Sequence, residues 1–266
     1  MTPEVAWAVA AGAFGLAVGS FLNVVIYRVP AGESVVSPPS RCPSCGSPIR
    51  PWHNVTVLGW LLLHGTCHDC RAPISVRYPL VEAGTGLLFA AVTWRLLALD
   101  MPWALPAYLY LAAAGIALAM IDIDVKRLPN AIVLPSYPVV AVLITVAALG
   151  ADEWWALARA AVGAAALFAF YFAIVLAVPA GMGFGDAKLA GVLGALMGYL
   201  SWSALIVATF GAFLLGAIVG VTLMVVGRAG RKTAIPFGPF MIAGALIAFF
   251  ADGWLTDGYL RLMGGG

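Results

Sequence analysis

Three aspartates stand where a charged side chain is unusual. Asp122 and Asp124 lie in "AMIDIDVKRLPNAIV", at the end of one apolar run, and Asp186 lies in "GMGFGDAKLAG", at the start of another. Carboxylates at a membrane edge are costly and tend to mark a site. Two that approach closely cannot both ionise, so they share a proton: one acts as general base on a water while the other protonates a substrate carbonyl. That is the chemistry of an aspartic protease.

The aspartates also fit a structural role. Asp186 precedes an apolar run as a helix N-cap does, and Asp124 can pair with a nearby cation. In the catalytic interpretation, Gly183 and Gly185 allow positive φ and let a substrate backbone approach closely. Asp122 and Asp124 point about 200° apart on a helix, so only one can face Asp186. Asp122 continues the apolar run "GIALAMI", so we expect it to be the less hydrated of the two.

Four cysteines form a second group with chemical potential. They occur as "CPSC", with Cys42 and Cys45, and as "CHDC", with Cys67 and Cys70, and 21 residues separate the pairs. This spacing is close to a zinc ribbon, in which four thiolates surround one ion. Two disulfides are the alternative. A four-thiolate site has no open position for catalysis, so we expect a structural zinc. The three histidines, which could replace a ligand, are expected to be solvated or packing residues: His53, His64 and His68.

Composition places these groups in a membrane protein. The chain is 63% hydrophobic and 10% charged, whereas soluble domains average about 25% charged residues. Runs of about 20 apolar residues can cross a bilayer as helices. We predict an all-α polytopic fold with about eight transmembrane helices, near residues 5–27, 83–99, 103–121, 131–149, 156–178, 188–200, 203–227 and 236–251. The largely apolar run from Leu189 to Gly227 is too long for one span, so we divide it at "GYLSWS", where a tight hairpin is possible.

The basic residues predict the orientation. With the N-terminus outside, and with the first span kept as an anchor, 11 of the 14 Lys and Arg residues fall on the cytoplasmic side. They are Arg28, Arg41, Arg50, Arg71, Arg77, Lys126, Arg127, Lys188, Arg228, Arg231 and Lys232. This topology places the aspartates and the four-cysteine loop at the cytoplasmic face. It divides the chain into a first helix (1–27), a cytoplasmic zinc-binding loop (28–80) and a transmembrane peptidase region (81–266). No nucleic-acid-binding signature is present.

Several motifs together resemble one family. "GxGD" at 183–186 followed by Lys188, "IDIDVKRLPN", "GSFLNVVIYRVP" (19–30), the paired CxxC motifs, "RYPLVE" (77–82) and "IPFGPF" (235–240) occur in the order found in type IV prepilin peptidases, which are membrane aspartic proteases. The resemblance spans nearly the whole chain. It implies Asp122 and Asp186 as the catalytic pair, since the family's first aspartate stands seven residues before the proline of "LPN", here Pro129.

The resemblance also implies the substrates and a second activity. Members remove the short basic leader of prepilins or pseudopilins at the cytoplasmic side of the bacterial inner membrane. Those with the cysteine loop commonly methylate the new N-terminus with S-adenosylmethionine. The loop departs from the family pattern, with Val-Thr at 55–56 in place of Ile-Pro and His64 in place of Arg. A peptidase without methyl transfer is therefore the alternative.

The sequence does not locate a site for the methyl donor, because no glycine-rich nucleotide motif is present. Asn23 and Glu82 are candidates, and both fit equally well as hydrated residues at helix ends. Two other classes of protein remain. A transporter would use Asp122 and Asp186 as ion sites, and a noncatalytic scaffold would tolerate their loss.

Overall fold

The structure is a computed structural model, and it describes residues 2–50, 53, 55–178, 181–228, 230, 233 and 235–262, with the side-chain surroundings of 252 and 255–262 left out. Arg231 and Lys232, which were counted for the orientation, lie outside the described residues. The described residues form helices and contain no named strand. The helices are α1 (Pro3–Arg28), α2 (Thr56–Leu62), α3 (Arg77–Ala98), α4 (Leu105–Val125), α5 (Asn130–Ala151), α6 (Trp154–Ala177), α7 (Phe184–Leu200), α8 (Trp202–Val225) and α9 (Gly238–Leu262).

Each of the eight predicted apolar spans corresponds to a helix, and the all-α class is confirmed. Six helices, α1, α3, α4, α5, α6 and α8, are long and apolar enough to cross a membrane, and the apolar part of α9 is the shorter stretch Gly238–Ala251. The remaining helix, α7, has 17 residues. The break at "GYLSWS" is confirmed: α7 ends at Leu200, and the hydroxyl of Ser201 accepts a hydrogen bond from the Ala204 N–H to begin α8. The chain is an integral membrane protein.

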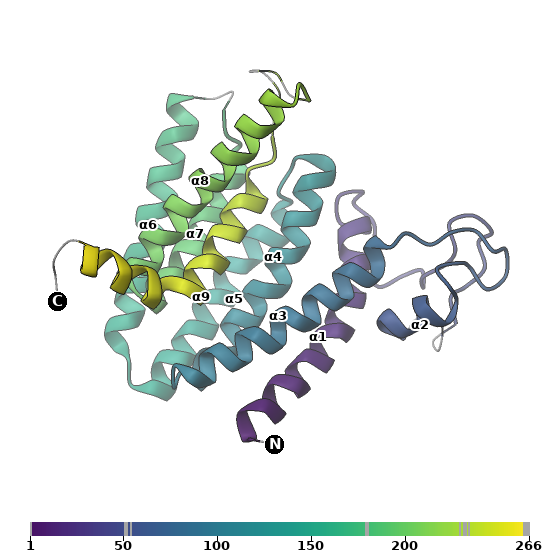
Figure 1. Cartoon of the computed structure of the whole chain (residues 1–266), viewed down its shortest axis with the longest axis horizontal. Helices are drawn as coiled ribbons and strands as arrows, with labels where there is room; N and C mark the ends of the chain where they lie inside the picture. Colours follow the sequence, from purple (N-terminus) through teal and green to yellow (C-terminus); the bar gives the residue numbers. More distant parts are fainter. Residues whose placement is uncertain are drawn as a thin grey trace. The chain divides into compact units, whose positions relative to one another are not determined.

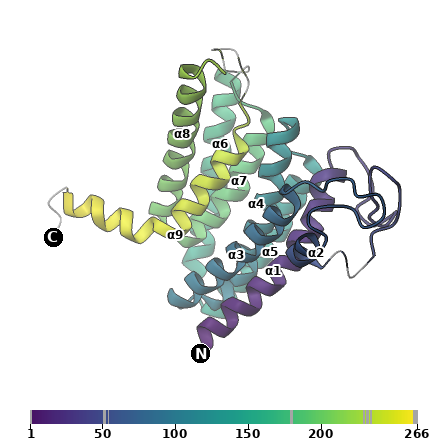
Figure 2. The same ribbon diagram turned by 45° about the vertical axis from the view of Figure 1, so that its right-hand side comes forward.

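The chain divides by compactness into two units, Met1–Ala117 and Leu118–Gly266. In the first unit α1 lies beside α3 (Figure 1, Figure 2). Their backbones approach closely at glycines. A Cβ atom on Gly15 would lie 2.9 Å from the Cα of Gly86, and one on Gly19 would lie 2.7 Å from the Cα of Glu82. Small residues allow such contact between membrane helices. The short helix α2, which the sequence did not predict, lies in the cysteine segment and packs on α3.

In the second unit α7 is the central helix, in contact with α5, α6, α8 and α9 (Figure 1). A Cβ atom on Gly163 of α6 would lie 2.5 Å from the carbonyl oxygen of Gly194 on α7. Arg159 of α6 donates hydrogen bonds to the carbonyls of Gly198, Tyr199 and Leu200, at 2.6, 2.6 and 3.1 Å. These carbonyls end α7 and have no partner inside the helix, so Arg159 closes its C-terminus. This structural role accounts for a cation that the topology places on the outer side.

Candidate active site and metal centre

Asp122 lies in the last turn of α4, and its side chain is buried with 5% of its surface exposed. Its Oδ2 accepts a hydrogen bond of 3.0 Å from the N–H of Gly238, 116 residues away and the first residue of α9. Asp124, two residues on, is exposed. The predicted difference in hydration between the two aspartates is therefore confirmed, and it follows from the rotation of the helix.

Asp186 lies in the first turn of α7 and is 8% exposed. It is the third helical residue, and Gly183 is the N-cap. The N–H of Gly183 donates to Asp186 Oδ2 at 3.0 Å, while the N–H of Asp186 donates to the Gly183 carbonyl at 3.1 Å. This reciprocal arrangement is a capping box. The expectation that Asp186 itself precedes the helix as N-cap is wrong; the spacing of glycine and aspartate in "GFGD" is the signal that places it at the third position.

The glycines of this motif have a different role from the expected one. Gly183 has φ of −80°, and Gly185 lies within α7, so neither uses the positive φ that glycine allows. Gly185 instead leaves room for a neighbouring side chain. A Cβ atom on Gly185 would lie 3.1 Å from the Cβ of Leu128, and one on Gly238 would lie 3.1 Å from Leu128 Cδ2. Leu128 thus packs against the beginnings of both α7 and α9, next to the two aspartates.

The two carboxyl groups share an environment inside the second unit. Each accepts a backbone N–H at the beginning of a helix, where the partial positive charge of the helix dipole favours a carboxylate. They are also close enough for their charges to interact. In both, the hydrogen bond recorded among the described residues uses Oδ2. The arrangement is suited to two carboxyl groups that share one proton.

A polar cluster fixes α7 against α5 next to the aspartates. The Nζ of Lys188 donates to Asn130 Oδ1 at 2.9 Å and lies 4.6 Å from the ring centre of Phe184. The hydroxyl of Tyr137 donates to the Lys188 carbonyl at 2.7 Å. Asn130 is the first residue of α5 and belongs to the "LPN" element. The sequence marked Lys188 and "LPN" as separate motifs, and the structure shows that they are in contact.

The four cysteines come together in the first unit, on two hairpin turns with the same backbone pattern. In the first turn the N–H of Cys42 donates to the Ser47 carbonyl and the N–H of Gly46 donates to Cys42. In the second the N–H of Cys67 donates to Ala72 and the N–H of Arg71 donates to Cys67. Single β-bridges close each turn, between Arg41 and Pro48 and between Thr66 and Pro73.

The two turns are an internal repeat offset by 25 residues, "SRCPSCGSPI" and "GTCHDCRAPI". Gly46 and Arg71 occupy the same position after the second cysteine and both have positive φ, 71° and 60°. This repeat was not predicted from the cysteine spacing, although the proline and isoleucine that follow each CxxC are a signal that reveals it.

The donor geometry fits a zinc ion. The four Sγ atoms all lie within 4.8 Å of one another, and Cys42 and Cys70 Sγ are 3.8 Å apart. Tetrahedral sulfurs about 2.3 Å from one ion lie about 3.8 Å apart. The cysteines are free thiols, which does not support the disulfide alternative. Hydrogen bonds from Ser47 lower the pKa of Cys45 to about 6, and backbone N–H groups of Cys70 and Asp69 lower the pKa of Cys67, which favours the thiolate that binds metal. Desolvation and the three neighbouring thiols instead raise the pKa of Cys70 to about 12.

Two of the histidines lie beside this centre. The rings of His53 and His68 stack at 4.7 Å, and His68 Nδ1 lies 2.9 Å from Asp69 Oδ1. The hydrogen bond with His68 is the main cause that lowers the pKa of Asp69. Among the described residues, the group whose ligand atoms gather consists of the four cysteines alone.

The two residues considered for the methyl donor lie close together but differ in burial. The Asn23 amide donates to the Tyr78 carbonyl at 3.2 Å, so it joins the end of α1 to the start of α3. Glu82 is 7% exposed. Its interpretation as a hydrated residue at a helix end is therefore wrong. It lies further inside α3 than expected because α3 begins at Arg77, six residues before the predicted span.

Residues 13–96 match the bacterial peptidase A24 N-terminal domain, and residues 109–221 match the type IV leader peptidase family. The prepilin leader peptidase/N-methyltransferases of Stutzerimonas stutzeri and Pseudomonas aeruginosa are 36% and 35% identical to it, over 93% and 94% of this chain and 91% and 92% of theirs. That of Neisseria gonorrhoeae is 36% identical, over 91% of this chain and 90% of its own. No solved structure was found to match. The chain belongs to the type IV leader peptidase family.

Proposed function

We propose that the chain is an aspartic endopeptidase that removes the leader of type IV prepilins or pseudopilins and then methylates the new N-terminus. The observation that carries the peptidase proposal is the pair formed by Asp122 and Asp186. Among the described residues, three carboxylic acids are buried, and these two lie in the same unit with their charges in range of each other. The third is Glu82, in the other unit. The names of the relatives support both activities.

The proposed hydrolysis needs one ionised and one protonated carboxyl group. The ionised group takes a proton from water as the water oxygen bonds to the scissile carbonyl carbon, and the protonated group gives its proton to the carbonyl oxygen. The C–N bond then breaks, the leaving nitrogen takes the proton from the first group, and the second group regains a proton from the hydroxyl. Both carboxyl groups return to their starting states. The N–H donors of Gly183 and Gly238 hold one oxygen of each group in place throughout.

We propose that this chemistry takes place at the cytoplasmic face of the bacterial inner membrane, with the N-terminus outside. The excess of Lys and Arg on the stretches next to the aspartates supports this orientation. Leader peptides that carry positive charge before an apolar segment would reach the site from the same side. The functional division of the chain into residues 1–27, 28–80 and 81–266 follows from the same proposal.

We further propose that Cys42, Cys45, Cys67 and Cys70 bind one structural zinc ion. The zinc would hold the two repeated turns together, and a site with four thiolates is closed to substrate. S-adenosylmethionine is the proposed methyl donor and supplies an electrophilic methyl group to the amine that leader cleavage exposes.

The experiment uses full-length protein in detergent with a synthetic prepilin, followed by mass spectrometry of the product. Asp122→Asn and Asp186→Asn are each expected to abolish leader removal, because an amide cannot share the proton or activate water. Asp124→Asn is the matched control, since it makes the same change on an exposed residue of the same helix turn, and it should retain most of the activity. Cleavage by both buried-site variants would refute the aspartic mechanism. Complete cleavage without an added methyl would leave a peptidase alone.

A further inference from the structure

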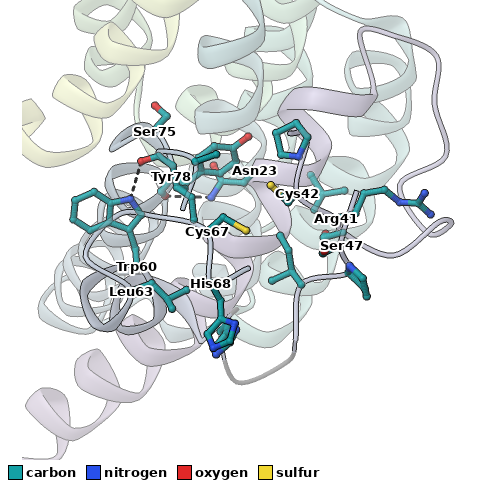
Figure 3. Close-up of a pocket in the computed structure, with 18 of the residues that line it drawn as sticks. Asn23, Arg41, Cys42, Ser47, Trp60, Leu63, Cys67, His68, Ser75 and Tyr78 are labelled. Carbon is teal, nitrogen blue, oxygen red and sulfur yellow. Dashed lines mark hydrogen bonds between the residues drawn. The ribbon is translucent and has the colours of Figure 1, made fainter. Parts of the chain in front are cut away.

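A large cavity lies in the first unit, between the end of α1, the two cysteine turns and the start of α3 (Figure 3). Its volume is about 590 Å³, within the range of about 300 to 1,000 Å³ typical of small-molecule sites. Figure 3 shows Asn23, Trp60 and Tyr78 together with Cys42 and Cys67 around it. The mechanism proposed for Asp122 and Asp186 makes no use of this cavity.

The buried acid of the wall is Glu82. The close approach of α1 and α3 at Gly19 leaves 7% of it exposed. Its side-chain partners within the described part of the chain are neutral, the hydroxyl of Ser20 and the amide of Asn23. These residues lie three apart on α1 and therefore on one face of that helix. A buried carboxylate without a cationic partner is costly. A positively charged group in the cavity would balance it.

Other residues supply an aromatic wall and positive charge. The indole of Trp60 is half buried, and its Nε1 donates to the Ile74 carbonyl at 3.1 Å, which fixes the plane of the ring. Gly65 lies against that ring, because a Cβ atom there would lie 2.7 Å from Trp60 Cζ2. A fixed aromatic surface of this kind suits the stacking of a nucleobase. Arg28 and Arg41 also line the cavity and can bind a carboxylate.

We infer that this cavity binds S-adenosylmethionine, with the sulfonium group next to Glu82 and the adenine against Trp60. The inference rests on the proposed methyl transfer and assigns it a site. A cationic centre, an aromatic base and a free carboxylate occur together in this class of molecule, and the cavity offers one partner for each. A nucleoside triphosphate fits less well, because its charge is negative and Glu82 would repel it.

The test measures binding to the full-length protein by calorimetry, without any prepilin. S-adenosylmethionine carries the sulfonium charge, and S-adenosylhomocysteine is the same molecule without the methyl group and that charge. Glu82→Gln should weaken binding of S-adenosylmethionine about tenfold to hundredfold, the range for a hydrogen-bonded or paired charge, and that of S-adenosylhomocysteine much less. Glu4→Gln is the matched control on α1, because Glu4 is exposed and does not line the cavity, and it should bind like the wild type.

A second pair of variants tests the aromatic wall independently of Glu82. Trp60→Leu should weaken both ligands to a similar degree, whereas Trp94→Leu should not, because Trp94 is 62% exposed on α3 and lies outside the cavity. Zinc content and thermal melting of each variant identify any that fail to fold. Equal losses for both ligands in Glu82→Gln overturn the placement of the sulfonium, and unchanged binding in both Glu82→Gln and Trp60→Leu overturns the site. If the wild type transfers methyl groups but the variants bind S-adenosylmethionine as tightly as it does, the cavity is refuted as the site and the proposed methyl transfer is not. If the wild type neither binds S-adenosylmethionine nor transfers methyl groups, the methyltransferase proposal is refuted as well.

Discussion

Gly238→Ala probes the contact that holds Asp122 in place. A Cβ atom at this position would lie 2.8 Å from Asp122 Oδ2, about 0.6 Å closer than the 3.4 Å at which ordinary contact begins. The other neighbour, Leu128 Cδ2 at 3.1 Å, leaves little room for the new methyl group to move away. The carboxylate must therefore shift by about half an ångström, and the hydrogen bond from the Gly238 N–H lengthens or breaks.

The size of the effect follows from that displacement. Misplacing a reacting group by about 1 Å costs about a hundredfold in rate, so we expect leader cleavage to fall about tenfold to hundredfold, equivalent to about 1.4 to 2.7 kcal/mol in the activation barrier. Zinc content should not change, because the cysteines lie in the other unit. The assay measures the initial rate at which a synthetic prepilin is cleaved in detergent, with enough enzyme to saturate the prepilin.

Gly253→Ala is the matched control for this prediction. It makes the same substitution in the same helix, α9, at a position where no atom lies within 4 Å of the added Cβ. Its cleavage rate should equal that of the wild type. If Gly238→Ala also cleaves at the wild-type rate, the N–H of Gly238 does not position the catalytic carboxylate, and our account of the site is refuted.

Three further predictions concern zinc affinity and stability. Arg71→Gly should raise the zinc affinity, measured by chelator competition, because Arg71 has positive φ where the repeat has Gly46 and a left-handed residue costs about 1 to 2 kcal/mol; an unchanged affinity would contradict this. Gly163→Ala should lower the melting temperature, since the new Cβ would meet the α7 backbone at 2.5 Å, whereas Gly84→Ala, with open space around it, should not. Arg159→Leu should lower the melting temperature further, with a loss of about 2 kcal/mol or more in the free energy of unfolding, since three carbonyls lose a charged donor. Arg159→Lys should recover only part of this loss.

Local patterns predicted much of the fold. Apolar runs are continuous in sequence, so all eight could be found, and the serine that begins α8 was visible at the break. The relative burial of Asp122 and Asp124 also followed from local geometry, because both lie on one helix. The gathering of the four cysteines was predictable because each knuckle is formed within a few residues.

Contacts between distant segments were not predictable in this way. The partner of Asp122 is the N–H of Gly238, 116 residues away, and no local pattern reports such a bond. The burial of Glu82 likewise depends on the approach of another helix at Gly19. The glycines of the "GxGD" motif were interpreted by their conformational freedom, whereas the structure shows that Gly185 makes room for Leu128 and that Gly183 is the N-cap of α7.

The repeated cysteine turns have a thermodynamic consequence for the cavity beside them. Cys42 and Cys67 belong both to the metal centre and to the cavity wall. An ion that joins the two turns closes the chain between them into a loop and removes much of its freedom before any ligand arrives. Whatever binds in the cavity then loses less entropy on binding, and by reciprocity its presence strengthens the hold on the metal. Metal supply would therefore raise the affinity for the small molecule.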